Sequence, residues 1–505
     1  MKKNVVFVAV LAFCSAVSAA NVWYVDADQG DDSWDGKVPF SEAIPDQNIG
    51  PKKTLSVFTD LVGNGDAIYA APGHYDDKTS DKATNCRFYT SVGNISLIAT
   101  GDASNTFIEG ALDSTVSATV SPYGCGANAI LPVKMLKGNN LIRGFTIIKG
   151  RQSQYTGADA YYGGGVVFDT GSTDTMVDCV VSNCVANRGG GVKNLGCAIR
   201  CHFTGNYADH GAHALNLSTA INCVFENTEK YAVYNGNAGG TFVNCTCRGN
   251  KEGNFRTNGG PINAYNSVFV KVSGTTPMNK LTQFFNCVFD YDPGVPPSAA
   301  EAIKGTNGEC RVVATGSLKF NADGTQCRGN PVINAGVAAY YDDNFPSAFA
   351  AEKELDVNRN ARTVDGLMDI GAVERQTGAV DDNEWFVDAV NGDNSKSGKT
   401  PALAMKSLVA IMEGRVKGDV VYAAPGVYSN DTIAVESQDY RVKIPAGVRL
   451  VGTEGAENTV ILGKASEIPD SKYGTGPGAI ACAYCAETDV NANWVAISGF
   501  TLSGG

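Results

Sequence analysis

Cys179-Val180-Val181, Cys201-His202-Phe203, Cys223-Val224-Phe225 and Cys245-Thr246-Cys247 begin at intervals of 22 residues. Ser267-Val268-Phe269 continues the series at the same interval, and Cys287-Val288-Phe289 follows after 20 residues. An apolar or thiol side chain thus stands two residues after each anchor. A fixed period in the low twenties, combined with this alternation, predicts a solenoid whose coils contain short strands.

The residue types of the repeat favour one kind of solenoid. Leucine-rich repeats share this period, but their leucine pattern is absent here. We therefore expect an all-β, right-handed parallel β-helix with about 22 residues per coil, whose inward Cys and Phe columns fill a narrow core. Asparagines stand just before the later anchors, where they are expected to form a ladder in left-handed turns: Asn222, Asn244, Asn266 and Asn286. Glu229 with Lys251, and Lys230 with Glu252, should pair between coils.

An open solenoid end exposes a strand edge that needs a cover. Two apolar segments at helical spacing precede a Gly-Asp pair and a strand, and we expect both to form short amphipathic capping helices. Their apolar positions are Leu55, Phe58, Leu61 and Val62 in the first segment, and Leu408, Ile411 and Met412 in the second.

A long internal repeat sets the domain organisation. Trp23-Tyr24-Val25-Asp26-Ala27 returns as Trp385-Phe386-Val387-Asp388-Ala389, and Tyr69-Ala70-Ala71-Pro72-Gly73 returns as Tyr422-Ala423-Ala424-Pro425-Gly426. We predict a complete β-helix unit over 21–375, divided into an opening and cap (21–75), coils (76–292) and a closing module (293–375). A linker (376–384) and the start of a second unit (385–505), truncated in this sequence, follow.

Composition and the N-terminus limit the function classes. The net charge of −12 over 505 residues opposes binding to a phosphate backbone, so no nucleic-acid partner is expected. Residues 1–20 combine Met1-Lys2-Lys3, a short apolar run and a small-residue end, which is typical of a Sec-type signal peptide. No other segment has the length of a transmembrane helix. These features predict a secreted or cell-surface protein.

Cysteines are numerous, but most lie inside the strand repeat rather than in loops. We favour buried thiols for the column, although the spacing of neighbouring coils also permits cross-coil disulfides. Outside the column, the candidate disulfides are Cys86 with Cys125, Cys310 with Cys327, and Cys482 with Cys485.

Two segments resemble modules of known secreted proteins. The stretch from Tyr24 through Asp31-Asp32-Ser33-Trp34-Asp35-Gly36 to Tyr75 resembles the opening module of bacterial right-handed parallel β-helix proteins of the DUF1565 and pectate-lyase-like families. Residues 330–336 and 369–374 are similar to a choice-of-anchor closing module, and the Gly-Gly-Gly-Val and Phe203-Thr204-Gly205-Asn206 motifs to polymorphic outer-membrane passengers. The resemblance implies fold and export; this fold hosts enzymes and adhesins alike.

Asp31, Ser33, Asp35 and Glu42 nearly follow a calcium-loop spacing. Ser33 replaces the usual Asp or Asn, and the second unit has Ala404 at the position that corresponds to Glu42. A turn in which Asp side chains accept bonds from nearby amides explains both copies and is the favoured interpretation. The alternative to this turn is a calcium-binding loop, and calcium is the one cofactor that the sequence suggests.

Asp209, His210 and His213, with His202 nearby, gather three of the four histidines, and alternation on a solenoid face would let His202, Asp209 and His213 converge. Surface-turn histidines are the favoured interpretation. A polyuronate lyase would need stacked acids holding calcium and a basic residue that abstracts a proton. Positions that lie one 22-residue period apart hold no stacked acids. Lys230 and Arg248 are the basic candidates, and the residues around them resemble ladders of opposite charges that pair between coils.

The leading functional hypothesis is a non-catalytic, adhesin-like surface protein that binds polysaccharide or another cell-surface glycan. The alternative is a polysaccharide lyase or other carbohydrate-active enzyme of pectate-lyase-like fold, which rests on fold analogy because no catalytic constellation is apparent. A mainly structural spacer is a third possibility. Oligomeric state does not follow from the sequence.

Overall fold

The computed structural model describes residues 21–505 apart from 78, 80–84, 117–123, 153–162, 172, 237–238, 271–281, 291–309, 314–317, 329, 469–473 and 486–495. The predicted signal peptide lies outside the described residues. Within them, no helix has the length and apolar character needed to cross a membrane. The chain forms two compact units, Met1–Thr377 and Gly378–Gly505.

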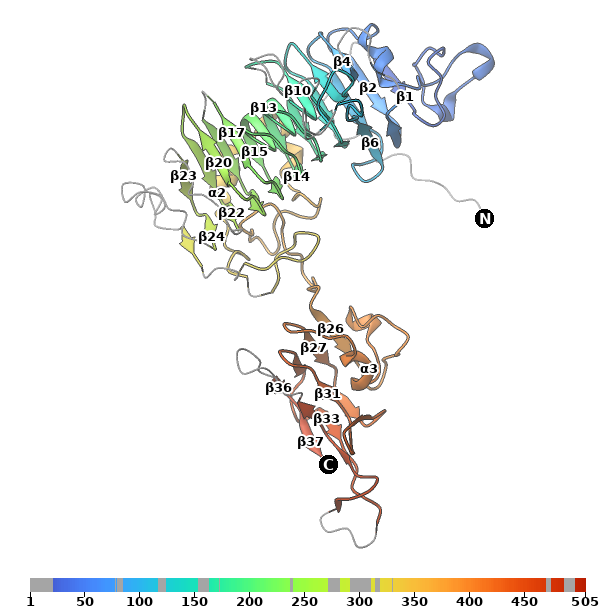
Figure 1. Ribbon diagram of the computed structural model, residues 1–505, viewed down its shortest axis with the longest axis vertical. Coiled ribbons are helices and arrows are strands. Elements are labelled where there is room, and N and C mark those ends of the chain that lie inside the picture. Colours follow the sequence, from blue (N-terminus) through green and yellow to red (C-terminus); the bar gives the residue numbers. More distant parts are fainter. Residues whose placement is uncertain are drawn as a thin grey trace. The chain divides into compact units, whose positions relative to one another are not determined.

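Three rows of parallel strands wind along the first unit (Figure 1). The first row contains β1 (Val22–Val25), β2 (Ala67–Ala70), β5 (Ser96–Ala99), β8 (Leu141–Arg143), β11 (Thr175–Val177), β13 (Val192–Ile199), β15 (Ala214–Ile221), β18 (Gly240–Val243), β21 (Ile262–Tyr265) and β23 (Thr282–Phe285). The second row joins it through the long strands β13 and β15, and adds β4 (Cys86–Thr90), β7 (Leu131–Met135), β10 (Val166–Phe168), β17 (Tyr231–Asn235) and β20 (Gly253–Thr257). The third row contains β3 (Gly73–Tyr75), β6 (Thr106–Glu109), β9 (Thr146–Ile148), β12 (Val180–Ser182), β14 (His202–Thr204), β16 (Val224–Glu226), β19 (Thr246–Arg248), β22 (Val268–Phe269), β24 (Val288–Phe289) and β25 (Arg311–Val312).

The 22-residue repeat forms the third row. Phe203 pairs in register with Phe225, which pairs with Cys247, and all three side chains are buried. The rings of Phe203 and Phe225 stack at 5.1 Å between centroids. Because equivalent residues meet in neighbouring coils, the alternation seen in the sequence becomes continuous apolar columns. The predicted all-β parallel β-helix is confirmed.

The asparagine ladder occupies the turn before this row. Asn222, Asn244, Asn266 and Asn286 have φ angles of 52°, 50°, 45° and 50°, the left-handed region that asparagine tolerates. The side-chain amide of Asn266 donates to Asn244 Oδ1 at 3.2 Å, and that of Asn286 donates to Asn266 Oδ1 at 2.8 Å. The predicted ladder is therefore present from Asn244 to Asn286, whereas the Asn222 side-chain amide donates to the Tyr341 hydroxyl and the Leu355 carbonyl instead. The predicted pairs Lys230–Glu252 and Lys251–Glu229 are also present, each at 2.7 Å.

The capping segments differ from each other. In the second unit, α3 (Leu408–Met412) is an α-helix that buries Leu408, Ile411 and Met412, as predicted. In the first unit the segment is a 3₁₀ helix, η3 (Leu55–Thr59), rather than an α-helix. Leu61 lies beyond its end and is 38% exposed, so its predicted place in the cap is wrong.

The second unit repeats the beginning of the first. Lys37 Nζ lies 3.2 Å from the ring centroid of Trp23, and Lys399 Nζ lies at the same distance from that of Trp385. Its parallel sheets contain β26 (Glu384–Val387), β27 (Val420–Ala423), β32 (Arg449–Gly452) and β36 (Ala496–Ser498), then β28 (Gly426–Tyr428), β33 (Thr459–Leu462) and β37 (Thr501–Ser503). Shorter pairs are β29 (Ile433–Val435) with β30 (Gln438–Tyr440), β30 with β34 (Ile480–Ala481), and β31 (Lys443–Ile444) with β35 (Tyr484–Cys485). Three short 3₁₀ helices lie outside these sheets: η1 (Phe40–Glu42), η2 (Pro45–Gln47) and η5 (Pro401–Leu403).

Residues 330–374 form a strap, by which we mean the segment that runs back along the outside of the first unit. It contains α2 (Ala338–Asn344) and η4 (Ser347–Glu352), and α2 lies beside the strands in Figure 1. Asn286 donates to the Ala335 carbonyl at 2.8 Å, and Asn266 to that of Val337 at 2.9 Å. The asparagine ladder thus supplies hydrogen bonds both to itself and to the strap.

Candidate functional site

The outward positions of the second row form one column of aromatic, aliphatic and cationic side chains. Successive strands pair in register through Tyr89 (β4), Lys134 (β7), Val167 (β10), Lys193 (β13), Leu215 (β15), Tyr234 (β17) and Arg256 (β20). Leu215 is buried and the other six are partly exposed. The column holds three cations and two tyrosines and no acid.

Period-two alternation explains why these side chains face outward. The preceding residue of each strand points into the core, as Phe88, Val133, Val233 and Phe255 show by being fully buried. The inward neighbours fix the backbone, so the outward side chains stand on a rigid sheet. They are spaced by the distance between paired strands, about 4.8 Å.

Tyrosine rings and cations contact each other along the column. Arg256 Cζ lies 5.5 Å from the ring centroid of Tyr231 and 5.7 Å from that of Tyr234. Lys134 Nζ lies 5.8 Å from the ring of Tyr89. These distances are those of cation–π contacts, which hold the long cationic side chains against the sheet.

His210 extends this surface to the next turn. Its ring packs edge-on against Tyr234 at 5.2 Å between centroids, and it pairs in register with Arg188 of the adjacent coil, as the 22-residue period predicts. Burial lowers the pKa of His210, and the nearby charges of Arg188 and Arg256 lower it further. We call the column together with Arg188, His210 and Tyr231 the aromatic–cationic face.

Lys230, Asp209 and His213 have separate environments. Lys230 pairs with Glu252, and Asp209 accepts a hydrogen bond from the side-chain amide of Asn187 at 3.4 Å. His213 is fully buried in the core, with Nδ1 3.2 Å from Asn206 Nδ2. The predicted convergence of His202, Asp209 and His213 is therefore wrong, because the alternation that holds within β14 does not continue through the turn to β15. The surface-turn interpretation is also wrong for His213, whose side chain is fully buried.

Arg248 and His202 meet on the third row instead. His202 Nε2 lies 2.8 Å from Glu226 Oε1, and Arg248 Nε binds the other carboxylate oxygen. Burial opposes ionisation of Glu226, but its hydrogen bond with His202 and the charge of Arg248 lower its pKa to about 2. Arg248 also lies over the ring of Phe320 at 5.6 Å.

The loop considered for calcium has the hydrogen bonds of a turn. Asp31 Oδ1 accepts from the backbone and the hydroxyl of Ser33 at 2.8 and 2.7 Å. These bonds lower the pKa of Asp31. Asp35 Oδ1 accepts from the amides of Lys37 and Gly50 at 3.1 and 3.2 Å. Glu42 lies in η1 and is exposed.

Metal ligands need to converge from several side chains. In the part of the chain that the structure describes, no group of three or more His, Cys, Asp or Glu side chains is placed to hold a metal ion. The near-match in spacing at residues 31–42 thus coincides with Asx-turn contacts rather than with a set of converging carboxylates.

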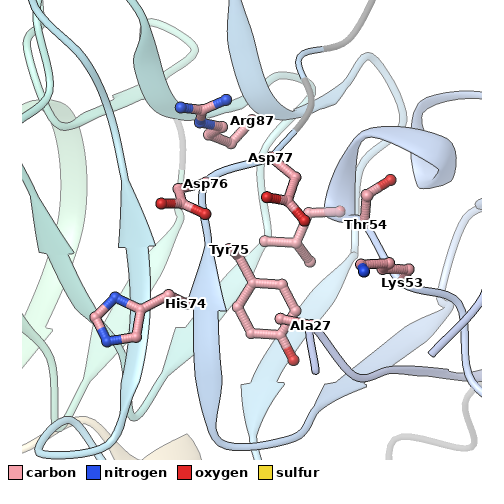
Figure 2. Close-up of a pocket in the computed structure, with 9 residues that line it drawn as sticks. Ala27, Lys53, Thr54, His74, Tyr75, Asp76, Asp77 and Arg87 are labelled. Atoms are coloured by element: carbon pink, nitrogen blue, oxygen red, sulfur yellow. The ribbon is translucent and has the colours of Figure 1, made fainter. Parts of the chain in front are cut away.

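A shallow recess lies at the beginning of the first unit (Figure 2). It is lined by Lys53, Asp76, Asp77 and Arg87 among others, so two cations stand with two carboxylates. Arg87 Nε donates to the Glu109 carbonyl at 2.8 Å. Burial lowers the pKa of Arg87, while the carboxylates oppose the change. The charges of this recess compensate one another, which favours a structural role.

The aromatic–cationic face is absent from the sequence-based candidates, apart from His210. Its members are spaced irregularly along the chain because the turns between β4 and β20 differ in length. A search at one fixed period follows the third row and misses the second. The sequence signal for this face is a Tyr, Lys or Arg that directly follows a buried Val or Phe in each of several short strands.

Comparisons with protein-family models and with the curated proteins find no match. Among solved structures, the chain is similar to the crystal structure of pectate lyase Pel9A, with 15% sequence identity and a TM-score of 0.39. The likeness covers 71% of this chain and 97% of that chain. The parallel β-helix described above rests on the strand registers themselves.

Proposed function

We propose that this chain is a secreted or cell-surface, non-catalytic protein that binds an anionic polysaccharide along the aromatic–cationic face. The observation that carries the proposal is the acid-free column from Tyr89 to Arg256, which presents cations and tyrosines on neighbouring coils. It stands out because the whole chain has a net charge of −12.

The chemistry of the face suits such a ligand. Tyrosine rings offer flat apolar surfaces to the C–H faces of sugars, and their hydroxyls add polar contacts. The Arg256 guanidinium can bind a carboxylate through two parallel hydrogen bonds, whereas Lys134 and Lys193 act as point charges. A rigid sheet loses little conformational entropy on binding, so these contacts are preorganised.

Binding to polygalacturonate and alginate, measured by isothermal titration calorimetry, tests the proposal. Arg256→Ala and Lys193→Ala should each weaken binding about tenfold, because each removes one charged hydrogen-bonding group. The matched control is Lys149→Ala, which removes an exposed cation in the turn after β9 of the third row. Equal affinity in all three variants, or equal affinity of the wild type for neutral glycans, contradicts the proposal.

A polysaccharide lyase is the second candidate function. It is favoured by one observation, the joint contact of His202 and Arg248 with Glu226, which places an acid–base group beside a cation on the partly exposed third row. β-Elimination leaves an unsaturated product that absorbs ultraviolet light. A rise in absorbance with polyuronates that disappears in His202→Gln would support the lyase, and no rise leaves the binding proposal in place.

Calcium at Asp31, Ser33, Asp35 and Glu42 stays a prediction. Bound calcium would raise the melting temperature of the native protein, since it binds the folded state alone. Asp35→Asn should abolish that rise if the loop is the site. A melting temperature that is the same with calcium and with a chelator would favour the turn interpretation.

A further inference from the structure

The cysteine column extends further than the regular repeat. Strand β25 pairs with β24 in register, with Arg311 opposite Val288, so Cys310 stands opposite Cys287. The Arg311 amide donates to the Cys287 carbonyl at 2.9 Å. Cys310 is therefore the last member of the column, although the sequence suggests Cys327 as its partner.

The strand register brings the two cysteines within the range of a disulfide. In-register residues of neighbouring parallel strands are about 4.8 Å apart and project to the same side, within the range of roughly 4.4–6.8 Å that a disulfide spans between Cα atoms. Cys310 Sγ lies 3.4 Å from the Cys287 amide nitrogen. Burial raises the pKa of the Cys287 thiol well above its usual range, and the neighbouring Cys310 thiol raises it further.

The pair is set apart from the rest of the column. Ser267 interrupts the cysteines between Cys245 and Cys287, and its hydroxyl accepts the Cys245 amide at 3.0 Å. Cys287 thus has a thiol neighbour in the column on one side. Cys201 and Cys223 have similar geometry, but both are fully buried, whereas Cys310 is partly exposed. Cys310 is thus the more exposed member of the pair.

Cys327 has other contacts. Its Sγ lies 3.3 Å from Asn321 Oδ1, and its backbone amide donates to the Lys319 carbonyl at 3.0 Å. Every cysteine that the structure describes is a thiol. Of the two possible partners of Cys310, Cys287 is the one that the strand register holds beside it.

We propose that Cys287 and Cys310 form a disulfide under oxidising conditions and so join the last strand of the third row to the array. The oxidant is a small disulfide such as oxidised glutathione. The Cys310 thiolate attacks it and releases one glutathione thiolate; Cys287, deprotonated, then attacks the Cys310 sulfur of the mixed disulfide and releases the second. Two thiol protons are lost, and two electrons reduce the oxidant.

The bond would act on a strand that has little packing of its own. β25 has two residues, Arg311 and Val312, and both are exposed, so few apolar contacts hold it. A cross-link between Cys287 and Cys310 closes the chain segment between them and reduces the freedom of the unfolded state. We therefore expect the last coil of the first unit to be more stable under oxidising than under reducing conditions.

The test uses the full chain incubated with oxidised glutathione, alkylated without reduction, digested and analysed by mass spectrometry. We expect a cross-linked peptide pair containing Cys287 and Cys310. We also expect dithiothreitol to lower the melting temperature by roughly 5 °C in the wild type and in the control Cys327→Ser, and to leave it unchanged in Cys310→Ser.

Two outcomes overturn the proposal: a Cys310–Cys327 cross-link, or alkylation of both Cys287 and Cys310 in the oxidised, folded protein. The peptide analysis of the wild type decides between them even where a cysteine variant fails to fold.

Discussion

His213 is a histidine that the fold keeps neutral. It is fully buried, and burial lowers its pKa from 6.5 to about 3. Below pH 6.5 the unfolded chain gains a proton that the folded chain does not accept. The free energy of unfolding therefore decreases as the pH is lowered from about 6.5 to about 3. The limiting slope from this residue is about 1.4 kcal/mol per pH unit.

Urea unfolding at a series of pH values between 6.5 and 4.5 tests this prediction. His213→Gln retains an acceptor for the Asn206 amide but cannot titrate, so its stability should decline less steeply than that of the wild type. His74→Gln is the control, since the His74 side chain is 59% exposed. Parallel pH profiles for His213→Gln and the wild type would show that His213 is protonated inside the fold.

The strap is the element whose docking depends on buried carboxyl groups. Glu374 accepts the Asp369 amide at 2.8 Å and faces Arg362 at 3.6 Å, and all three residues are buried. Burial raises the pKa of Glu374 to about 8, although Arg362 opposes the shift. Stability from this group is present below pH 4.5 and is lost as pH rises toward 8, the opposite sign to His213.

Glu374→Gln keeps the shape of the side chain and removes its charge. We expect the variant to lose less stability than the wild type between pH 5 and 8, with a difference of about 1 kcal/mol or more by pH 8. Hydrogen exchange at the strap amides measures it locally. Glu354→Gln, an exchange at an exposed position of the same strap, is the control. Equal exchange profiles for Glu374→Gln and the wild type would show that ionisation of Glu374 does not weaken the docking of the strap.

Elements also show what the sequence could predict. The third row could be predicted because Cys201, Cys223 and Cys245 follow one period along the chain, and this period equals the register of the paired strands. The second row was not, since the turns before Lys193 and Tyr234 differ in length and only the folded coil brings such residues into one column. Long-range packing likewise decides the strap: nothing near Asn266 in the sequence indicates that Val337 will bind it.

At the scale of the whole molecule, the aromatic–cationic face predicts a dependence of affinity on ligand length. From Tyr89 to Arg256 the column crosses seven strands, and each step is about 4.8 Å. An extended pyranose chain advances by a comparable distance per sugar, so successive sugars can meet successive coils. Size-fractionated oligogalacturonates should bind more tightly with each added sugar until the column is covered, and then reach a plateau. Calorimetry measures this series, and added salt should weaken the longest ligands most, because they engage the most cations. A trimer that binds as tightly as the long oligomers would restrict recognition to about three coils and exclude the full column as the binding surface.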